Sequence, residues 1–172
     1  MVNRAIFLDR DGVINEPIVR NGKPYAPRKF VDFVLLPDVE LAINEMVSMG
    51  FLVFVVTNQP DIGNGLVDPL EIEKMHQLVG DLKINQIYMC PHSQIEYCSC
   101  RKPKPGMIWR ARDEHNIVLQ SSYLVGDRKT DMEAAMNAGC LSVFVDRGYT
   151  ESIDVEANYT CKSLMESLNF IT

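Results

Sequence analysis

The sequence lacks any apolar stretch long enough to cross a membrane. Its longest apolar run covers residues 51–56, far short of the ~20 residues that a membrane-spanning helix needs. The start of the chain also lacks the charged segment, apolar core and small-residue cleavage site of a secretory signal. We therefore expect a cytoplasmic protein that has no membrane partner.

Positive charge is scarce as well. The 172 residues include 17 Lys or Arg and 23 Asp or Glu, which gives a net charge of -6. This balance argues against a nucleic-acid-binding protein that relies on a broad basic surface. A small anionic ligand is still compatible with it, because a few local donors can hold a phosphate group.

Internal repeats, low-complexity segments and linkers are absent too. Apolar residues make up 47% of the chain and charged residues 23%, as is usual for a globular protein. The length suits one domain, on a prior of about 150 residues per domain. We expect a single domain over residues 1–172 that acts as a monomer.

Short apolar runs alternate with helical patterns along the chain. Runs rich in β-branched and aromatic residues predict strands at residues 2–8, 51–56, 86–90, 122–125 and 141–145. Helices are predicted at 39–49 with Asp38 as the cap, from Asp68 onward, and at 105–115, 130–138 and 163–168. This alternation predicts an α/β fold, a three-layer Rossmann-like parallel sheet with helices on both faces. Ligands of such sheets bind beyond the carboxyl ends of the strands.

Polar side chains follow the predicted strands at that edge. Asp9 and Asp11 come directly after the first strand, and carboxylates at i and i+2 point to the same side, where both can meet one metal or substrate. Taken alone, these residues could simply form a turn. The other polar residues at strand ends or before helices are Thr57, Asn58, Arg101, Lys102, Asp127 and Asp131. Each is weak evidence alone, since turns, helix caps and solvated charges use the same residue types.

Three of the five cysteines cluster with a histidine. Cys90, His92, Cys98 and Cys100 provide three thiolates and one imidazole, a complete tetrahedral set for Zn²⁺. The alternative is a group of buried thiols and a loop histidine that merely lie close together. We favour zinc, because the four residues surround a loop that lacks a core of its own.

Four protein ligands leave no position open for water, so the predicted zinc is structural. We expect it to hold the loop at residues 90–100, which delivers Arg101 and Lys102 to an anion. Cys140 and Cys161 lie elsewhere in the chain and are predicted to be ordinary core or surface residues. His76 and His115, both in predicted helices, are interpreted as structural.

The order of the motifs over residues 5–146 resembles the haloacid dehalogenase superfamily of aspartate-nucleophile phosphatases: D-x-D, then Thr, then Lys, then G-D-x-x-x-D. The resemblance implies a Mg²⁺-dependent phosphomonoesterase that forms an aspartyl-phosphate. It makes Asp9 the nucleophile and Asp11 the general acid and base. Thr57 and Lys102 would bind the transferring phosphoryl group.

The resemblance also implies two further sets of residues. Asp131 would orient Lys102 or a metal-bound water without being a metal ligand itself. The implied Mg²⁺ ligands are Asp9, Asp11 and Asp127. The implied substrate-binding residues are Asn58, Arg101 and Arg128. The assignment is chemically consistent, since an anionic nucleophile attacking a phosphate needs nearby positive charge, which Mg²⁺ and Lys102 supply.

Within the superfamily, the string from Cys90 to Met107, with Thr57-Asn-Gln and Gly126-Asp-Arg, resembles the D-glycero-D-manno-heptose 1,7-bisphosphate phosphatases. This implies removal of the 7-phosphate from a phosphorylated sugar on the route to lipopolysaccharide or other surface glycans. The histidinol-phosphate phosphatases share the zinc loop, so histidinol phosphate or another small sugar phosphate is the alternative substrate. A non-catalytic, zinc-stabilised binding module is the alternative from another class.

Two features depart from the heptose family. Its usual Ser-Gly-Ile-Ala-Arg-Gly is Pro-Asp-Ile-Gly-Asn-Gly at residues 60–65, so an arginine that could meet a second phosphate is missing and Asp61 adds negative charge. The zinc loop is also shorter than usual. The interval from Asp11 to Thr57 must hold a helix and a strand, which leaves no space for a large cap domain. Residues 15–36 are expected to form a small flap over the site.

Overall fold

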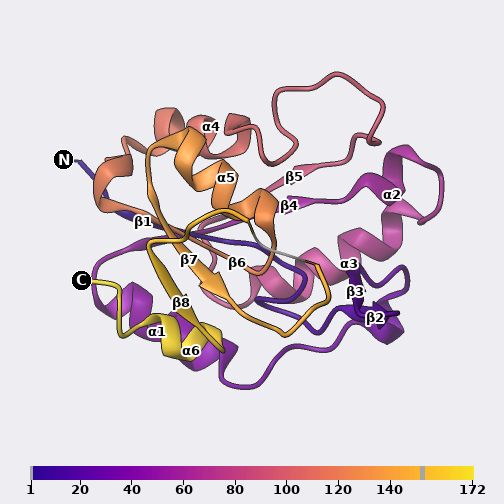
Figure 1. Cartoon of the computed structure of the whole chain (residues 1–172), viewed down its shortest axis with the longest axis horizontal. Coiled ribbons are helices and arrows are strands. Elements are labelled where there is room, and N and C mark those ends of the chain that lie inside the picture. The colour runs from indigo at the N-terminus through magenta and orange to yellow at the C-terminus, as the bar shows by residue number, and fades with distance from the viewer. Residues whose placement is uncertain (1, 152–153) are drawn as a thin grey trace.

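A six-stranded parallel sheet forms the middle layer of the protein, as the computed structural model of residues 2–151 and 154–172 shows (Figure 1). The strand order is β5-β4-β1-β6-β7-β8, and each neighbouring pair is parallel. The strands are β1 (Ala5–Leu8), β4 (Leu52–Asn58), β5 (Gln86–Cys90), β6 (Tyr123–Gly126), β7 (Leu141–Val145) and β8 (Tyr159–Cys161). Five of them match predicted strands. The short edge strand β8 was not predicted.

Helices cover both faces of the sheet, so the predicted three-layer α/β architecture is confirmed. One face packs against α1 (Val39–Ser48), α3 (Pro69–Gly80) and α6 (Leu164–Ser167). The other packs against α4 (Gly106–His115) and α5 (Lys129–Ala138). In β1, Ile6 and Leu8 belong to the first core, whereas Ala5 and Phe7 belong to the second. Successive strand residues point to opposite faces, and burial of both faces explains the continuous apolar runs.

The helix boundaries follow local signals with one exception. The Asp68 side chain accepts a hydrogen bond of 3.0 Å from the Leu70 amide at the start of α3, as its position predicts. Helix α1 begins at Val39 as expected, but Asp38 does not cap it. Its backbone is left-handed, with φ 61°, and its side chain makes no capping bond. The prediction of Asp38 as a cap was therefore wrong.

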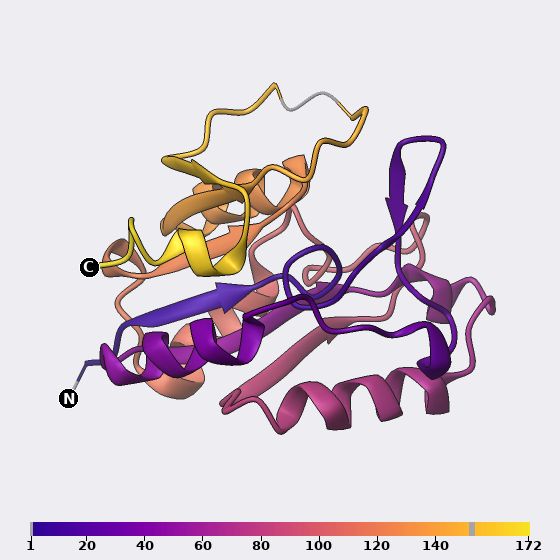
Figure 2. The same ribbon diagram turned by 90° about the horizontal axis from the view of Figure 1, so that it is seen from below.

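A small flap stands at the carboxyl end of the sheet. Strands β2 (Ile18–Arg20) and β3 (Lys23–Tyr25) form an antiparallel hairpin, which projects at the upper right of Figure 2. The 3-10 turn η1 (Phe30–Asp32) follows it, and the short helix α2 (Pro60–Gly63) follows β4. A second 3-10 turn, η2 (Leu119–Ser121), precedes β6. The hairpin agrees with the small flap predicted for residues 15–36.

The N- and C-termini lie on the same side of the molecule, away from the flap (Figure 1). Arg4 Nη1 donates a hydrogen bond of 2.8 Å to the carbonyl of Thr172. Among the described residues, no helix is both long and apolar enough to cross a membrane.

Candidate active site

The predicted acidic and polar residues meet where β1, β4 and β6 end. Because β1 lies between β4 and β6, Asp9 after β1 and Asp127 after β6 are brought together beside the end of β4. They line a cavity of about 490 Å³, within the range of about 300–1,000 Å³ typical of small-molecule sites. Other residues of its wall are Asp11, Arg28, Asn58, Asp61, Arg101, Lys102 and Arg128.

Lys102 is the central cation of this cavity. Its side chain is only 3% exposed, and its Nζ lies 2.9 Å from Asp9 Oδ1 and 2.6 Å from Asp131 Oδ1. Nζ also donates to the carbonyl of Val56 at 2.7 Å. Three acceptors therefore fix the ammonium group beside the Asp9 carboxylate. The position of Asp131 agrees with its predicted role of orienting Lys102.

Asn58 holds the backbone of the same residue. Its Nδ2 donates to the carbonyl of Lys102 at 3.1 Å, and its Oδ1 accepts from the Lys102 amide at 3.0 Å. Thr57 is fully buried, and its hydroxyl accepts a bond of 2.9 Å from Gln59 Nε2. The polar end of β4 thus contributes Asn58 to the cavity wall and holds the backbone of Lys102 in place.

Burial and like charges govern the carboxyl groups. Burial raises the pKa of Asp9 to about 7, Lys102 opposes the rise, and Asp131 and Asp11 add to it. Burial likewise holds the pKa of Asp127 well above its usual range, with further contributions from Asp9 and Asp131. Ionised carboxylates crowded in this way need positive charge close by.

Asp9, Asp127 and Asp131 form a compact cluster in which one carboxylate oxygen from each lies within 4.8 Å of the others. Asp127 Oδ1 is buried and has no hydrogen-bond partner among the described residues. Hard oxygen ligands of this kind suit Mg²⁺, so the cluster fits the expected ion. The Asp11 carboxylate, predicted as a third ligand, lies outside this cluster. Asp131 is instead the third member of the cluster, and its carboxylate is paired with Lys102.

The Asp11 carboxylate instead accepts hydrogen bonds from three neighbours: Arg10 Nη2 at 3.0 Å, Asn15 Nδ2 at 3.0 Å and Gln59 Nε2 at 2.8 Å. Arg10 is fully buried. Sequence reasoning gave no role to Arg10 or Gln59, although both stand within the quoted motifs. Their position between two strand ends fixes the orientation of the Asp11 carboxyl group.

Behind Arg10 lies His76 of α3, whose Nε2 is 3.2 Å from Arg10 Nη1. Burial is the main cause that lowers the pKa of His76 to about 4, and the Arg10 charge lowers it further against the opposing effect of Asp11. His76 is therefore neutral at pH 7, and its Nε2 can accept from the guanidinium. The structural interpretation of His76 stands, and its partner is now identified.

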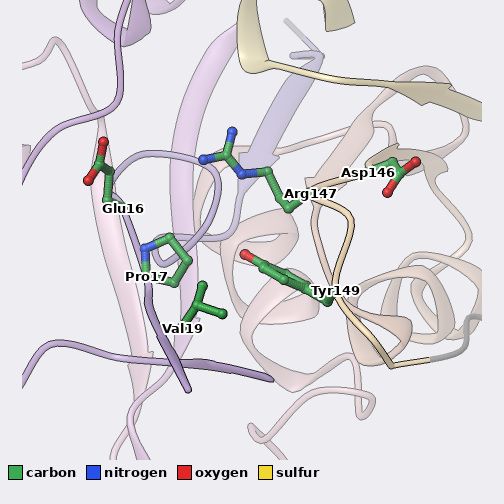
Figure 3. A pocket seen from close by; sticks show the side chains of 6 residues that line it. All are labelled: Glu16, Pro17, Val19, Asp146, Arg147 and Tyr149. Atoms are coloured by element: carbon green, nitrogen blue, oxygen red, sulfur yellow. The ribbon is translucent and has the colours of Figure 1, made fainter. Parts of the chain in front are cut away.

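Tyr149 is a further site residue that the sequence motifs did not indicate. Its hydroxyl donates a bond of 2.8 Å to Asp127 Oδ2. It also lines a second opening, with Glu16, Pro17 and Val19 on one side and Asp146, Arg147 and Tyr149 on the other (Figure 3). No pattern around position 149 signals this contact, which depends on the path of the chain after β7.

The four predicted zinc ligands lie together beside the cavity. Cys90 Sγ is 3.7 Å from Cys98 Sγ, and His92 Nδ1 lies 3.4 Å from Cys90 Sγ and 3.3 Å from Cys100 Sγ. A tetrahedron with Zn–S bonds of ~2.3 Å has S···S edges of about 3.8 Å, so the donor set and its spacing fit Zn²⁺. Cys140 and Cys161 are buried outside this cluster, as expected.

Three arginines line the cavity wall. Arg101, directly after the Cys100 position, has a buried Nη1 with no hydrogen-bond partner among the described residues. Arg128 Nε pairs with Glu151 at 2.6 Å. Arg28, after the flap hairpin, pairs through Nε with Asp61 at 2.7 Å. The first two were predicted from the sequence, whereas Arg28 was not.

Known proteins are similar to this chain in sequence. Residues 99–169 match a family model described as HAD-hydrolase-like. A D-glycero-beta-D-manno-heptose-1,7-bisphosphate 7-phosphatase of Helicobacter pylori is 35% identical over 143 residues, which cover 79% of each chain. The D-glycero-alpha-D-manno-heptose-1,7-bisphosphate 7-phosphatase of Campylobacter jejuni is 34% identical over 99% of this chain and 96% of its own.

A solved structure gives the same picture of the fold. The D,D-heptose 1,7-bisphosphate phosphatase of B. bronchiseptica, complexed with magnesium and phosphate, superposes with a TM-score of 0.80 at 26% identity. The match covers 98% of this chain and 99% of that one. The resemblance drawn from the sequence motifs is therefore confirmed.

Proposed function

Since the chain belongs to the haloacid dehalogenase-type (HAD) phosphatases, we propose that it removes the 7-phosphate from D-glycero-D-manno-heptose 1,7-bisphosphate. The observation that carries the proposal is the Asp9 carboxylate held 2.9 Å from the Lys102 ammonium in the wall of the 490 Å³ cavity. An anionic nucleophile and a fixed cation at one position suit attack on a phosphate ester. The substrate is inferred from the relatives.

In the first step, an Asp9 oxygen attacks phosphorus, and the bond between phosphorus and the sugar oxygen breaks. Asp11 donates a proton to the leaving sugar oxygen, so the products are a free hydroxyl and an aspartyl-phosphate on Asp9. In the second step, Asp11 takes a proton from water and the water oxygen attacks phosphorus. The bond between phosphorus and the Asp9 oxygen breaks, which releases inorganic phosphate and regenerates the Asp9 carboxylate. One carboxyl group thus acts first as acid and then as base. The bonds from Arg10, Asn15 and Gln59 orient it for both tasks.

Positive charge around the phosphoryl group comes from several sources in the proposed site. Lys102 neutralises the attacking carboxylate, and Nη1 of Arg101, which has no hydrogen-bond partner among the described residues, is available to a phosphate oxygen. Asp9 and Asp127 would hold Mg²⁺, which when bound offsets the negative charge that gathers on the phosphoryl oxygens. Asp131 keeps Lys102 in place, and Tyr149 orients Asp127.

In the proposed function, Zn²⁺ has a structural role. Cys90, His92, Cys98 and Cys100 would provide four protein ligands to the ion, and a fully protein-ligated zinc leaves no position for a reacting water. The cluster fixes the loop whose continuation delivers Arg101 and Lys102. It thereby replaces the apolar core that this short segment lacks.

The proposal is tested by phosphate release with Mg²⁺ from a panel of esters. The panel contains both anomers of the heptose bisphosphate, heptose 7-phosphate, histidinol phosphate and simple sugar monophosphates. We expect the highest kcat/KM for a heptose bisphosphate. A higher value for histidinol phosphate, or equal values throughout, would overturn the substrate assignment.

The role of the nucleophile is tested with Asp9→Asn. We expect turnover to fall at least about 10³-fold, because the amide cannot form the covalent intermediate. Circular dichroism should show a preserved fold. Asp113→Asn, an exposed change of the same chemistry on α4, should retain turnover. Appreciable phosphate release by Asp9→Asn would remove Asp9 as the nucleophile.

A further inference from the structure

Arg28 and Asp61 join two separate segments in the wall of the catalytic cavity. Arg28 follows the flap hairpin β2–β3, and Asp61 lies in α2 after β4. Their Nε···Oδ2 distance is 2.7 Å, and both side chains line the cavity that contains Asp9 and Lys102. The ion pair thus places a guanidinium group from the flap in the substrate cavity.

The Arg28 guanidinium keeps most of its donors available. Among the described residues, hydrogen bonding to Arg28 is confined to its Nε, and the side chain is 46% exposed. The Nη groups are therefore accessible from the cavity. A guanidinium group is a planar fork whose geometry matches phosphate oxygens. Asp61 holds one edge of that fork and orients the other.

The segment at residues 60–65 does not supply such a cation itself. Asn64 is uncharged, and its side-chain amide donates to Gln94 Oε1 at 3.0 Å. The other carboxylates of the wall are Asp9, Asp11 and Asp127. Without Arg28, the uncompensated charge of Asp61 would repel an anion from this part of the cavity. Arg28 both cancels that charge and adds a phosphate-binding edge.

The other cationic side chains of the cavity wall already have partners or an assigned role. Lys102 is bound to Asp9 and Asp131, and Arg128 is bound to Glu151. The proposed function assigns Arg101 to the reacting phosphoryl group. Arg28 enters from a different element and is left for a second anionic group.

We infer that Arg28, oriented by Asp61, is a specificity residue that binds the non-reacting phosphate of a bisphosphorylated sugar. The inference rests on the proposed function and names the part of the site that distinguishes a bisphosphate from a monophosphate. Arg28 takes no part in bond cleavage. Its contact raises kcat/KM for substrates that carry the second phosphate.

The test compares kcat/KM for heptose 1,7-bisphosphate and heptose 7-phosphate, with fructose 1,6-bisphosphate and fructose 6-phosphate as a second pair. In Arg28→Ala the ratio of bisphosphate to monophosphate should fall about 10- to 100-fold, as expected for a lost charged hydrogen bond. Arg28→Lys should give an intermediate ratio, because lysine keeps the charge but not the fork. Lys29→Ala removes the same charge one residue away, outside the cavity lining, and should keep the wild-type ratio.

A double variant separates binding from simple neutralisation. If Arg28 only cancelled Asp61, Arg28→Ala with Asp61→Asn would recover the wild-type ratio, and that recovery would overturn the inference. An unchanged ratio in Arg28→Ala, or an equal fall in Lys29→Ala, would also overturn it. Circular dichroism and thermal unfolding of each variant confirm that the compared proteins are folded.

The same panel separates failure of the inference from failure of the proposed function. A wild-type protein that hydrolyses both members of each pair equally well overturns the role of Arg28 and leaves the phosphatase chemistry intact. A wild-type protein that prefers fructose 1,6-bisphosphate overturns the heptose assignment, while the effect of Arg28→Ala on that pair still decides the role of Arg28.

Discussion

The Lys102 ammonium lies 2.9 Å from the Asp9 carboxylate, although the two residues are far apart in the sequence. Both side chains are nearly excluded from solvent, with 3% of Lys102 and 12% of Asp9 exposed. Burial lowers the pKa of Lys102, but the carboxylates of Asp131 and Asp9 raise it more, so the net shift is upward and the group stays charged. The same cation restrains the rise that burial causes in the pKa of Asp9. The two carboxylates thus keep Lys102 charged, and Lys102 in turn favours the ionised form of Asp9 that the proposed chemistry needs.

Lys102→Met should destabilise the fold strongly at neutral pH. Two buried carboxylates, Asp9 and Asp131, would lose their cation, and removing one partner of a buried ion pair costs about 3–5 kcal/mol. The loss should shrink at pH 5, because unpaired buried carboxyl groups take up protons more readily in the native than in the unfolded state. Urea unfolding at pH 7.5 and pH 5 measures both effects.

The control for this change is Lys74→Met, which breaks the exposed pair between Lys74 and Glu71. Its stability should hardly change, since exposed ion pairs contribute little. Equal losses in the two variants, or a loss in Lys102→Met that does not depend on pH, would contradict the structural account of the buried cation.

Gly12→Ala should disable the site through Asp127. Gly12 has φ +90°, and a Cβ there would lie 1.8 Å from Asp127 Oδ2. Asp127 would have to move, so we expect turnover to fall at least about 10²-fold, as for other small displacements of catalytic groups. Phosphate release over a range of Mg²⁺ concentrations is the measurement.

Gly50→Ala is the matched control, since Gly50 has φ +84° but the described part of the chain places no atom within 4 Å of the added Cβ. Both variants carry the strain of alanine at positive φ, and Gly12→Ala adds the displacement of Asp127, so it should lose more stability than Gly50→Ala. Only Gly12→Ala should lose more activity than its loss of stability explains. Similar activity in the two variants would show that the Gly12 position does not govern Asp127.

Cys98→Ser should release the proposed zinc. The loop would lose one of four ligands, and structural zinc sites contribute directly to folding free energy. We expect about one equivalent of zinc per chain in the wild type and less in the variant, with a lower Tm and lower turnover, since Lys102 follows this loop. Metal analysis, thermal unfolding and phosphate release provide the three readouts.

Cys161→Ser changes a buried thiol outside the cluster and should keep the zinc content of the wild type. Zinc loss from Cys98→Ser with Tm and turnover unchanged would rule out the structural role. Full zinc content in Cys98→Ser would rule out Cys98 as a ligand.

His76 should make the protein less stable as the pH falls. Its native pKa of about 4 lies below the ordinary value of ~6.5, so the unfolded chain takes up the proton first. Stability is complete above pH ~6.5 and declines as the pH falls toward 4, by about 1 to 2 kcal/mol between pH 7 and pH 5. Denaturant unfolding at several pH values tests this.

In His76→Gln the decline should be smaller by that amount, because the amide oxygen can accept from Arg10 and does not titrate. His115→Gln should retain the wild-type decline, since His76 is still present. Identical pH profiles for the wild type and His76→Gln would show that the contact between His76 and Arg10 does not shift the protonation of this histidine.

Local sequence patterns predicted the α/β fold and the acidic, lysine and cysteine residues of the site. The short apolar runs, the helix signals such as that at Asp68 and the polar residues after strands predicted a parallel sheet with Asp9 and Asp127 at its carboxyl edge. The spacing of the cysteines predicted the cluster around His92. These features are determined by residues close to one another in the chain, and their physical rules apply segment by segment.

The partners of these residues depended on the tertiary structure. The contact of Arg10 with His76, the bond from Tyr149 to Asp127 and the pairing of Arg28 with Asp61 join distant segments. The position of the Asp11 carboxylate was decided in the same way, because Gln59 reaches it from the neighbouring strand. The sequence specifies which side chains each strand or helix carries at its end, but the twist of the sheet and the path of its loops decide which of these side chains come into contact.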